Sequence, residues 1–187
     1  DADHVAAFLD ENPDITSIFC VYHETSTGIL NPIEHLGGLC RERGLYLIVD
    51  AVSALGGEEF YFDSFGVDLC ISSSNKSLHA FSGISILCCN TRMRKKLRSI
   101  PPKTFYLDLN RYLDQIEENN QTPFTPAVNN LVALEKAIDE LLEMGIEQRW
   151  NRYRLFNQRI LYRMMEMGFV PYADPLFKSN SITIFYL

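Results

Sequence analysis

Residues 45–53 read LYLIVDAVS, an apolar run of strand length that is followed at once by an acid, Asp50. Near-continuous apolar residues predict a strand that is buried on both faces, which is typical of a parallel sheet covered by helices. Similar runs occur at 15–22, 67–72 and 84–89. A helix is expected over residues 32–43, with Gly44 after its end. The alternation of strands and helices predicts the α/β class, with a doubly wound, mainly parallel sheet and helices on both faces.

The second half of the chain has a helical pattern. Apolar residues are spaced for one helix face over residues 127–144, and Gly145 stands in the position that ends a helix. A second helix is expected over residues 147–167, and the stretch 181–187 alternates weakly like a strand. We therefore expect a domain boundary near Gly145. Residues 1–145 would form the larger domain, and residues 146–187 would begin a smaller α+β domain.

Composition narrows the classes of partner. The 187 residues include 17 Lys and Arg against 24 Asp and Glu, which gives a net charge of −7, and 47% of them are hydrophobic. The apolar content argues against a disordered chain. The acidic balance argues against nucleic acid as a partner, because binding to a phosphate backbone requires clustered Lys and Arg. No apolar stretch approaches the roughly 20 residues that span a bilayer, so no membrane partner is expected.

Cysteine and histidine usage indicates neither a disulfide framework nor a metal centre. The five cysteines are an odd number and form no CxxC pair, which predicts reduced thiols in a cytoplasmic protein. The four histidines show no metal-ligand spacing, so no metal is expected.

Polar clusters follow three of the expected strands, and in open α/β sheets ligands bind beyond the carboxyl ends of the strands. Asp50 follows one strand, and Lys76 follows the next, after a run of serines and Asn75. Pyridoxal phosphate (PLP) requires both an acid, to balance its ring nitrogen, and a lysine, to hold its aldehyde as a Schiff base. Taken singly, Asp50 is more often a turn residue and Lys76 a solvated side chain. The ordered combination therefore supports the PLP hypothesis.

Two longer blocks carry a resemblance to a known family. They are HETSTGILNPIEHLGGLCRERGLYLIVDAVSALGG at 23–57 and DLCISSSNKSLHAFSGISILC at 68–88. They resemble the fold-type I, class V PLP-dependent aminotransferases, and within that class most resemble the 2-aminoethylphosphonate:pyruvate transaminases, with the alanine:glyoxylate aminotransferases as near relatives. The resemblance implies transamination between a small amino donor and a keto-acid acceptor, with PLP as cofactor, in a homodimer.

The resemblance also implies roles for six residues. Lys76 would be the Schiff-base lysine, and Asp50 would pair with the pyridine nitrogen. Val52 would pack on one ring face, Thr25 would bond near the ring hydroxyl, and Asn75 would lie by the phosphate. Thr125 would reach the phosphate of the neighbouring subunit. An alternative reading makes Thr125 the N-cap of the following helix, with Pro126 at its first position.

Other functions remain as alternatives. Family members are longer, and the glycine-containing phosphate loop and the substrate arginine that the resemblance implies are not expected within this sequence. We therefore expect a partial chain, and a non-catalytic truncated domain is the alternative to an aminotransferase. A cysteine desulfurase is disfavoured, because Asn75 rather than His precedes Lys76 and no cysteine follows Cys89.

Overall fold

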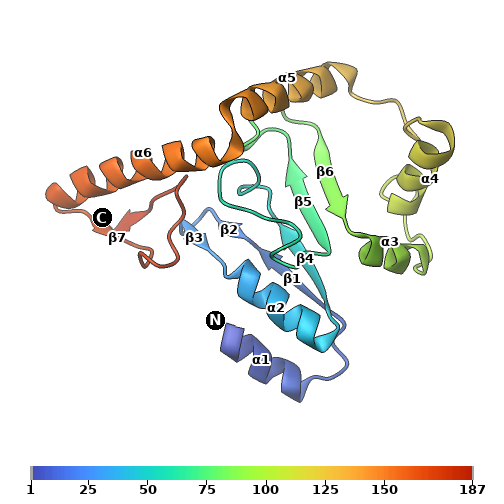
Figure 1. The fold of residues 1–187 in the computed structure, drawn as a ribbon, viewed down its shortest axis with the longest axis horizontal. Helices are drawn as coiled ribbons and strands as arrows, with labels where there is room; N and C mark the ends of the chain where they lie inside the picture. The colour runs from blue at the N-terminus through green and yellow to red at the C-terminus, as the bar shows by residue number, and fades with distance from the viewer. Residues whose placement is uncertain (1, 187) are drawn as a thin grey trace.

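The computed structural model describes residues 2–186 and contains a central sheet of four strands (Figure 1). The strands are β1 (Ser17–Val21), β4 (Tyr46–Asp50), β5 (Leu69–Ser73) and β6 (Ser85–Cys89), in the spatial order β1-β4-β5-β6. β1, β4 and β5 are parallel, which confirms the expected α/β class and mainly parallel sheet. β6 is antiparallel to β5, because the short connection 74–84 contains no crossover helix and can only return the chain as a hairpin.

Two helices, α1 (Ala2–Glu11) and α2 (Ile33–Arg43), lie along one side of the sheet (Figure 1). The main core forms here and includes the fully buried Leu47 and Val49 of β4. The expectation that the strands are buried on both faces holds for the adjacent Leu69 and Cys70 of β5. It does not hold for Phe19 of β1 or Leu87 of β6, which are exposed within residues 2–186.

The second half is helical, as expected. It contains α3 (Thr91–Arg98), α4 (Leu109–Asn119), α5 (Val128–Met144) and α6 (Ile146–Glu166), followed by the short strands β7 (Val170–Pro171) and β8 (Phe185–Tyr186). α4 was not predicted from the sequence. The strand expected at 181–187 is shorter than predicted, and its last residue, like the first residue of the chain, lies outside the described residues. The N-cap reading of Thr125 is wrong, because α5 begins at Val128 and its N-cap position is Ala127.

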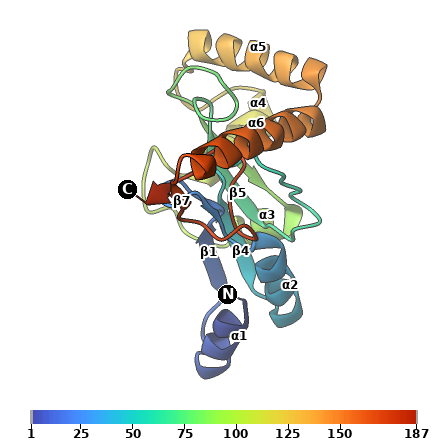
Figure 2. The same cartoon turned by 90° about the vertical axis from the view of Figure 1, so that its left-hand side faces the viewer.

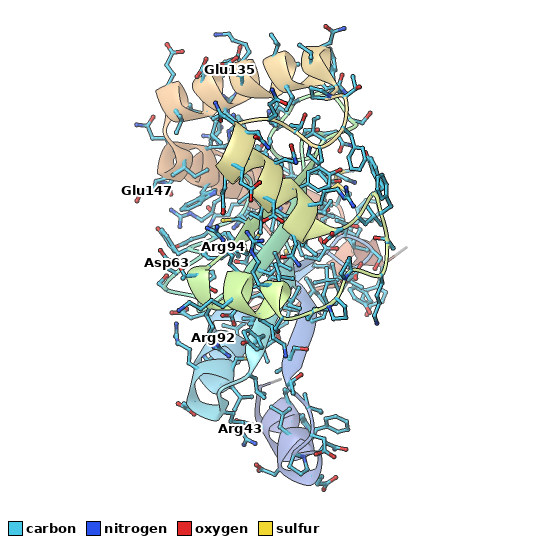
Figure 3. The ribbon with its side chains drawn as sticks, turned by 90° about the vertical axis from the view of Figure 1, so that its right-hand side faces the viewer. Arg43, Asp63, Arg92, Arg94, Glu135 and Glu147 are labelled. Atoms are coloured by element: carbon cyan, nitrogen blue, oxygen red, sulfur yellow. The ribbon has the colours of Figure 1, made fainter. Side chains whose placement is uncertain are left out.

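The basic residues of α3 are used in contacts with neighbouring elements. Arg94 forms an ion pair with Glu117 of α4, and Figure 3 shows Arg92 and Arg94 on the same short helix. Arg92 instead donates to the carbonyl oxygens of Gly44 and Leu45, at 2.8 and 2.7 Å. The arginines of α3 therefore connect this helix to α4 and to the residues just before β4.

α5 and α6 run across the end of the sheet at which β5 finishes (Figures 1 and 2). Leu134 and Leu141 of α5 bury a second apolar cluster against Leu78, which follows β5. Among residues 2–186, no helix combines the length and apolarity that crossing a bilayer would require.

Candidate active site

Asp50 lies at the carboxyl end of β4, between the two neighbouring parallel strands. Its partners in register are Val21 of β1 and Ile71 of β5. The main chain is fixed on both sides, because Tyr22 N donates to Asp50 O and Ala51 N donates to Ile71 O, each at 2.8 Å. The carboxylate Oδ1 accepts a hydrogen bond from Val52 N at 2.9 Å. This is the local turn bond that Asp favours, and the remaining acceptor capacity of a carboxylate suffices for a ligand as well.

Lys76 lies in the loop that follows β5, at the same edge of the sheet. The loop is closed by bonds from His79 N to Lys76 O and from Ala80 N to Ser74 O, both 2.9 Å, and by Ser74 Oγ to Phe81 O at 2.5 Å. The side chains of Asn75 and Lys76 are exposed. Because β4 and β5 are parallel neighbours, their carboxyl ends bring the loops of Asp50 and Lys76 to one edge of the sheet, as the sequence predicted. We call this edge, at the carboxyl ends of β1, β4 and β5, the rim.

The carbonyl oxygen of Ser53 links the loops that follow β1, β4 and β5. It accepts a hydrogen bond from His23 Nδ1 at 3.0 Å and a longer one from Ser77 Oγ at 3.5 Å. Since a carbonyl oxygen only accepts, Nδ1 of His23 must carry the proton, and in the neutral ring Nε2 is then an acceptor. The lysine loop is therefore tied to the loop of Asp50 through one main-chain atom.

Two buried polar atoms at this rim have no partner in the part of the chain that the structure describes. They are Nε2 of His23, whose side chain is 3% exposed, and Oγ of Ser73, the last residue of β5. Buried polar groups in native proteins are normally hydrogen-bonded, so each of these atoms indicates a position where a polar ligand or water binds. Neither residue is among the six to which the resemblance assigns a role, although Ser73 belongs to the serine run before Lys76. The position of His23 directly after a strand, at the same rim as Asp50, was the signal that could have revealed it.

Gly56 and Gly57 allow the lysine loop to approach the loop of Asp50 closely. A Cβ on Gly57 would lie 2.5 Å from Ser77 Oγ and 2.8 Å from Ser77 Cβ, and Gly56 has a φ of 90°, which disfavours other residues. Both glycines were also missed as site residues. Their lack of side chains creates the space in which Ser77 sits, one residue from Lys76.

Thr25 lies on the turn of a small hairpin formed by β2 (His23–Glu24) and β3 (Ile29–Leu30), and it is exposed. In the same turn Glu24 Oε1 accepts a hydrogen bond from Ser26 Oγ at 2.7 Å, and this bond lowers the pKa of the Glu24 carboxyl. Because the hairpin continues from β1, it places Thr25 next to the rim. The turn that would present Thr25 to a ligand is thus internally hydrogen-bonded.

Thr125 is not on the loops that follow β1, β4 and β5. It is exposed, in the segment between α4 and α5, and Figure 1 shows this segment on the side of the molecule away from the β2–β3 hairpin. The other five predicted residues, Thr25, Asp50, Val52, Asn75 and Lys76, are on those loops or strand ends.

The chain is similar in sequence to known aminotransferases. The family described as aminotransferase class-V matches residues 1–186. An uncharacterised aminotransferase of Methanocaldococcus jannaschii is 36% identical over 180 residues, which cover 96% of this chain and 47% of that protein. A 2-aminoethylphosphonate–pyruvate transaminase of Aeromonas hydrophila is 32% identical over 184 residues, which cover 97% and 48%. The chain therefore spans about half the length of these relatives.

Solved structures show the same relationship. Pyridoxamine–pyruvate aminotransferase from Mesorhizobium loti superimposes with a TM-score of 0.94 at 29% identity, covering 100% of this chain and 48% of its own. Alanine–glyoxylate aminotransferase from Nostoc sp. superimposes with a TM-score of 0.93 at 27% identity, covering 99% and 49%. The fold is thus that of part of the large domain of PLP-dependent aminotransferases. Within them, the chain belongs to the class-V aminotransferase family.

The residues at the rim fit PLP, the cofactor on which this family depends. Lys76 offers an exposed amine, and Asp50 offers a carboxylate on a main chain that is paired with a strand on each side. The Ser73 hydroxyl and the Nε2 atom of His23 are buried polar groups without a partner among residues 2–186. An amine, an acid and unused polar atoms are the groups that a phosphorylated pyridine aldehyde would engage.

Proposed function

We propose that this chain forms the lysine-bearing part of an active PLP-dependent aminotransferase. The observation that carries the proposal is the meeting of Asp50 and the Lys76 loop at one rim, joined through the Ser53 carbonyl oxygen. When bound, PLP supplies an aldehyde that combines with amines and a ring that accepts the electrons left behind when a substrate carbon loses its proton. The protein must then hold the ring, bind the phosphate and move that proton.

The proposed roles follow the chemistry of each side chain. The Asp50 carboxylate keeps a proton on the ring nitrogen, and the Lys76 amine first holds the cofactor and then carries the proton from the substrate carbon. Val52 covers one ring face, Thr25 binds near the ring hydroxyl, and Asn75 lies by the phosphate. The fixed main chain on both sides of Asp50 supports this assignment, because it holds the acid in one position.

We further propose 2-aminoethylphosphonate as amino donor and pyruvate as acceptor, with phosphonoacetaldehyde and alanine as products. The similarity to a relative named for this reaction supports the proposal. The alternative is an alanine:glyoxylate reaction, since an aminotransferase named for that pair has nearly the same fold. Both reactions use the same lysine and acid, so residues beyond the rim must distinguish the substrates.

A panel of donors and acceptors tests the reaction. In the full-length protein loaded with PLP, 2-aminoethylphosphonate and pyruvate are expected to give alanine, measured by chromatography of the amino acids. Glycine formation from alanine and glyoxylate at a higher kcat/KM would favour the alternative. Absence of amino-group transfer with every pair would contradict catalysis and favour a non-catalytic domain.

We propose that the protein acts as a homodimer in which Thr125 contributes to the neighbouring site. The exposed Phe105 and Tyr106 pack on the half-buried Phe124 beside this segment, with ring centroids of Tyr106 and Phe124 4.9 Å apart. Exposed apolar patches of this kind mark interaction surfaces. The position of Thr125 away from the rim of its own chain is consistent with a role in the second subunit.

Complementation tests the contribution of Thr125. We expect Thr125→Ala and Lys76→Ala proteins to be impaired separately, and their co-expression to restore activity to about one quarter of wild type, because half of the dimers are mixed and each has one intact site in a symmetric dimer. Activity after co-expression that merely equals the sum of the two variants would contradict a role in the partner's site.

Two further proposals concern the setting of the chain. A cytoplasmic location is supported by the five cysteines, all of which are free thiols.

A domain boundary near Gly145, between residues 1–145 and residues 146–187, is supported by the φ of 84° at this glycine, where α5 ends and α6 begins.

A further inference from the structure

Two side chains of α6 contact the lysine loop from outside the proposed site. Arg149 Nη1 donates to the carbonyl oxygen of Ser77 at 2.9 Å, and Tyr153 Oη lies 2.8 Å from His79 Nε2. These contacts join residues 72 and 74 positions apart in the sequence. Both contacts lie on the carboxyl side of Lys76, at Ser77, the next residue, and at His79, two residues after Ser77.

The Arg149 anchor is buried and specific. Its side chain is only 5% exposed, although a guanidinium loses much hydration when it leaves water. No ion pair of Arg149 is found among residues 2–186, and the contact found there is to a main-chain oxygen of the loop. A buried cation that binds a loop carbonyl fixes the position of that carbonyl closely, because moving it away would leave the charge without an acceptor.

The His79 anchor holds an unfavourable backbone conformation. His79 has a φ of 65°, in the left-handed region, which a residue other than glycine adopts only where its surroundings hold it. Burial and the charge of Arg149 lower the pKa of its imidazole, which favours the neutral ring, in which Nε2 can accept a hydrogen bond from the Tyr153 hydroxyl. The Tyr153 ring also lies over Gly57, 3.4 Å from where a Cβ would be.

α6 links these anchors to the end of the chain. The same 21-residue helix carries Asn157, whose Nδ2 donates to Thr183 Oγ1 at 2.7 Å and whose Oδ1 accepts from Lys178 Nζ at 3.0 Å. One helix therefore contacts both the lysine loop and the segment 178–183, and the loop is contacted from outside by α6 in addition to the Ser53 carbonyl oxygen.

We propose that Arg149 and Tyr153 are positioning residues for Lys76: by fixing Ser77 and His79 they hold the loop that directs the lysine amine toward PLP. This inference rests on the proposed role of Lys76 and adds to it the two residues that set the geometry. Without the anchors, the exposed Lys76 and Asn75 would be held by the bonds within the loop, the long bond to Ser53 and the packing of Leu78, and the left-handed His79 would relax.

Matched variants separate positioning from general stability. Tyr153→Phe keeps the ring over Gly57 and removes only the hydroxyl, whereas Tyr162→Phe makes the same change at an exposed position of α6. Arg149→Met is compared with Arg149→Lys, which retains the charge, and with Arg159→Met, an exposed arginine of the same helix. These variants are made in the full-length protein.

Three readouts are used, and none of them depends on turnover. In Tyr153→Phe we expect the apparent Kd for PLP, from absorbance titration, to rise about threefold to tenfold, as for one lost hydrogen bond. The visible circular dichroism per bound cofactor should fall, because the ring is held less uniformly. Amide exchange of residues 74–84 in the PLP-free protein should accelerate several-fold, while the Tyr162→Phe control stays at wild-type values. Arg149→Met should show larger changes, and Arg149→Lys should recover part of them.

The outcomes that would overturn the inference are distinct from failure of the proposed function. Wild-type PLP affinity, dichroism and loop exchange in both Tyr153→Phe and Arg149→Met would overturn the positioning role alone. Equal effects of Tyr153→Phe and Tyr162→Phe would do the same. A Lys76→Ala protein that retains the PLP absorption band would overturn the proposed role of Lys76, and this inference with it.

Discussion

Lys76→Ala is expected to abolish the covalent retention of PLP. It is also expected to lower kcat by about 100-fold to 10,000-fold, which is the contribution that a positioned proton-transfer group makes. The reason is that one amine both holds the cofactor and carries the proton, and the anchored loop offers no second lysine. The first measurement is the absorption band at the blue edge of the visible, which reports the bond between lysine and PLP. The second is mass spectrometry after borohydride reduction, which locates the modified peptide.

Lys103→Ala is the matched control, because Lys103 is an exposed lysine in the segment after α3. It should bind PLP and turn over as the wild type does. Retention of the band in Lys76→Ala, or the finding of reduced PLP on another lysine, would contradict the proposed role of Lys76. Exogenous amines that restore some turnover to Lys76→Ala would further support proton transfer by this side chain.

Glu58→Ala is expected to lower the free energy of unfolding by about 3 kcal/mol or more, since it leaves several donors unsatisfied at a fully buried position. Glu58 is 0% exposed, and its carboxylate accepts hydrogen bonds from two neighbouring residues near the end of the chain. They come from Asn180 N at 2.9 Å, Asn180 Nδ2 at 3.1 Å, Ser181 N at 2.9 Å and Ser181 Oγ at 2.7 Å. For a domain of this size, such a loss lowers Tm by about 6–12 °C, measurable by thermal unfolding.

Glu59→Ala provides the comparison, because the neighbouring side chain is exposed. It should leave Tm within about 2 °C of wild type, as most surface substitutions do. Glu58→Gln keeps the length and some acceptor capacity, and should lose less stability than Glu58→Ala. Equal melting temperatures for Glu58→Ala and Glu59→Ala would show that the carboxylate does not hold residues 180 and 181 in solution.

The sequence predicted those features that depend on local pattern and on the general rules for parallel sheets. The apolar runs located β1, β4 and β5, and the rule that ligands bind at their carboxyl ends placed Asp50 and Lys76 at one rim. The apolar run at 84–89 also located β6, but not its direction. That depends on the connection 74–84, which lacks a helix.

The contacts that hold the rim together were not predictable, because they join residues that are distant in sequence. Glu58 and Asn180 are 122 residues apart, and Arg149 and Ser77 are 72 apart. In the sequence, Glu58 is simply one of two adjacent acids after a glycine pair, and Arg149 is one of many basic residues on a polar helix. Only the packing of the two halves shows that both side chains are buried and paired with main-chain groups.

The Ser53 carbonyl oxygen, which bonds to both His23 and Ser77, constrains how this family of sequences can change. A main-chain acceptor is present whatever side chain stands at position 53, so substitution there leaves it in place. Its location depends instead on the number of residues after Asp50, because insertion or deletion of one residue would move the oxygen away from both donors. Substitution of residue 53 is therefore compatible with both hydrogen bonds, whereas a change in the length of the loop after Asp50 is not.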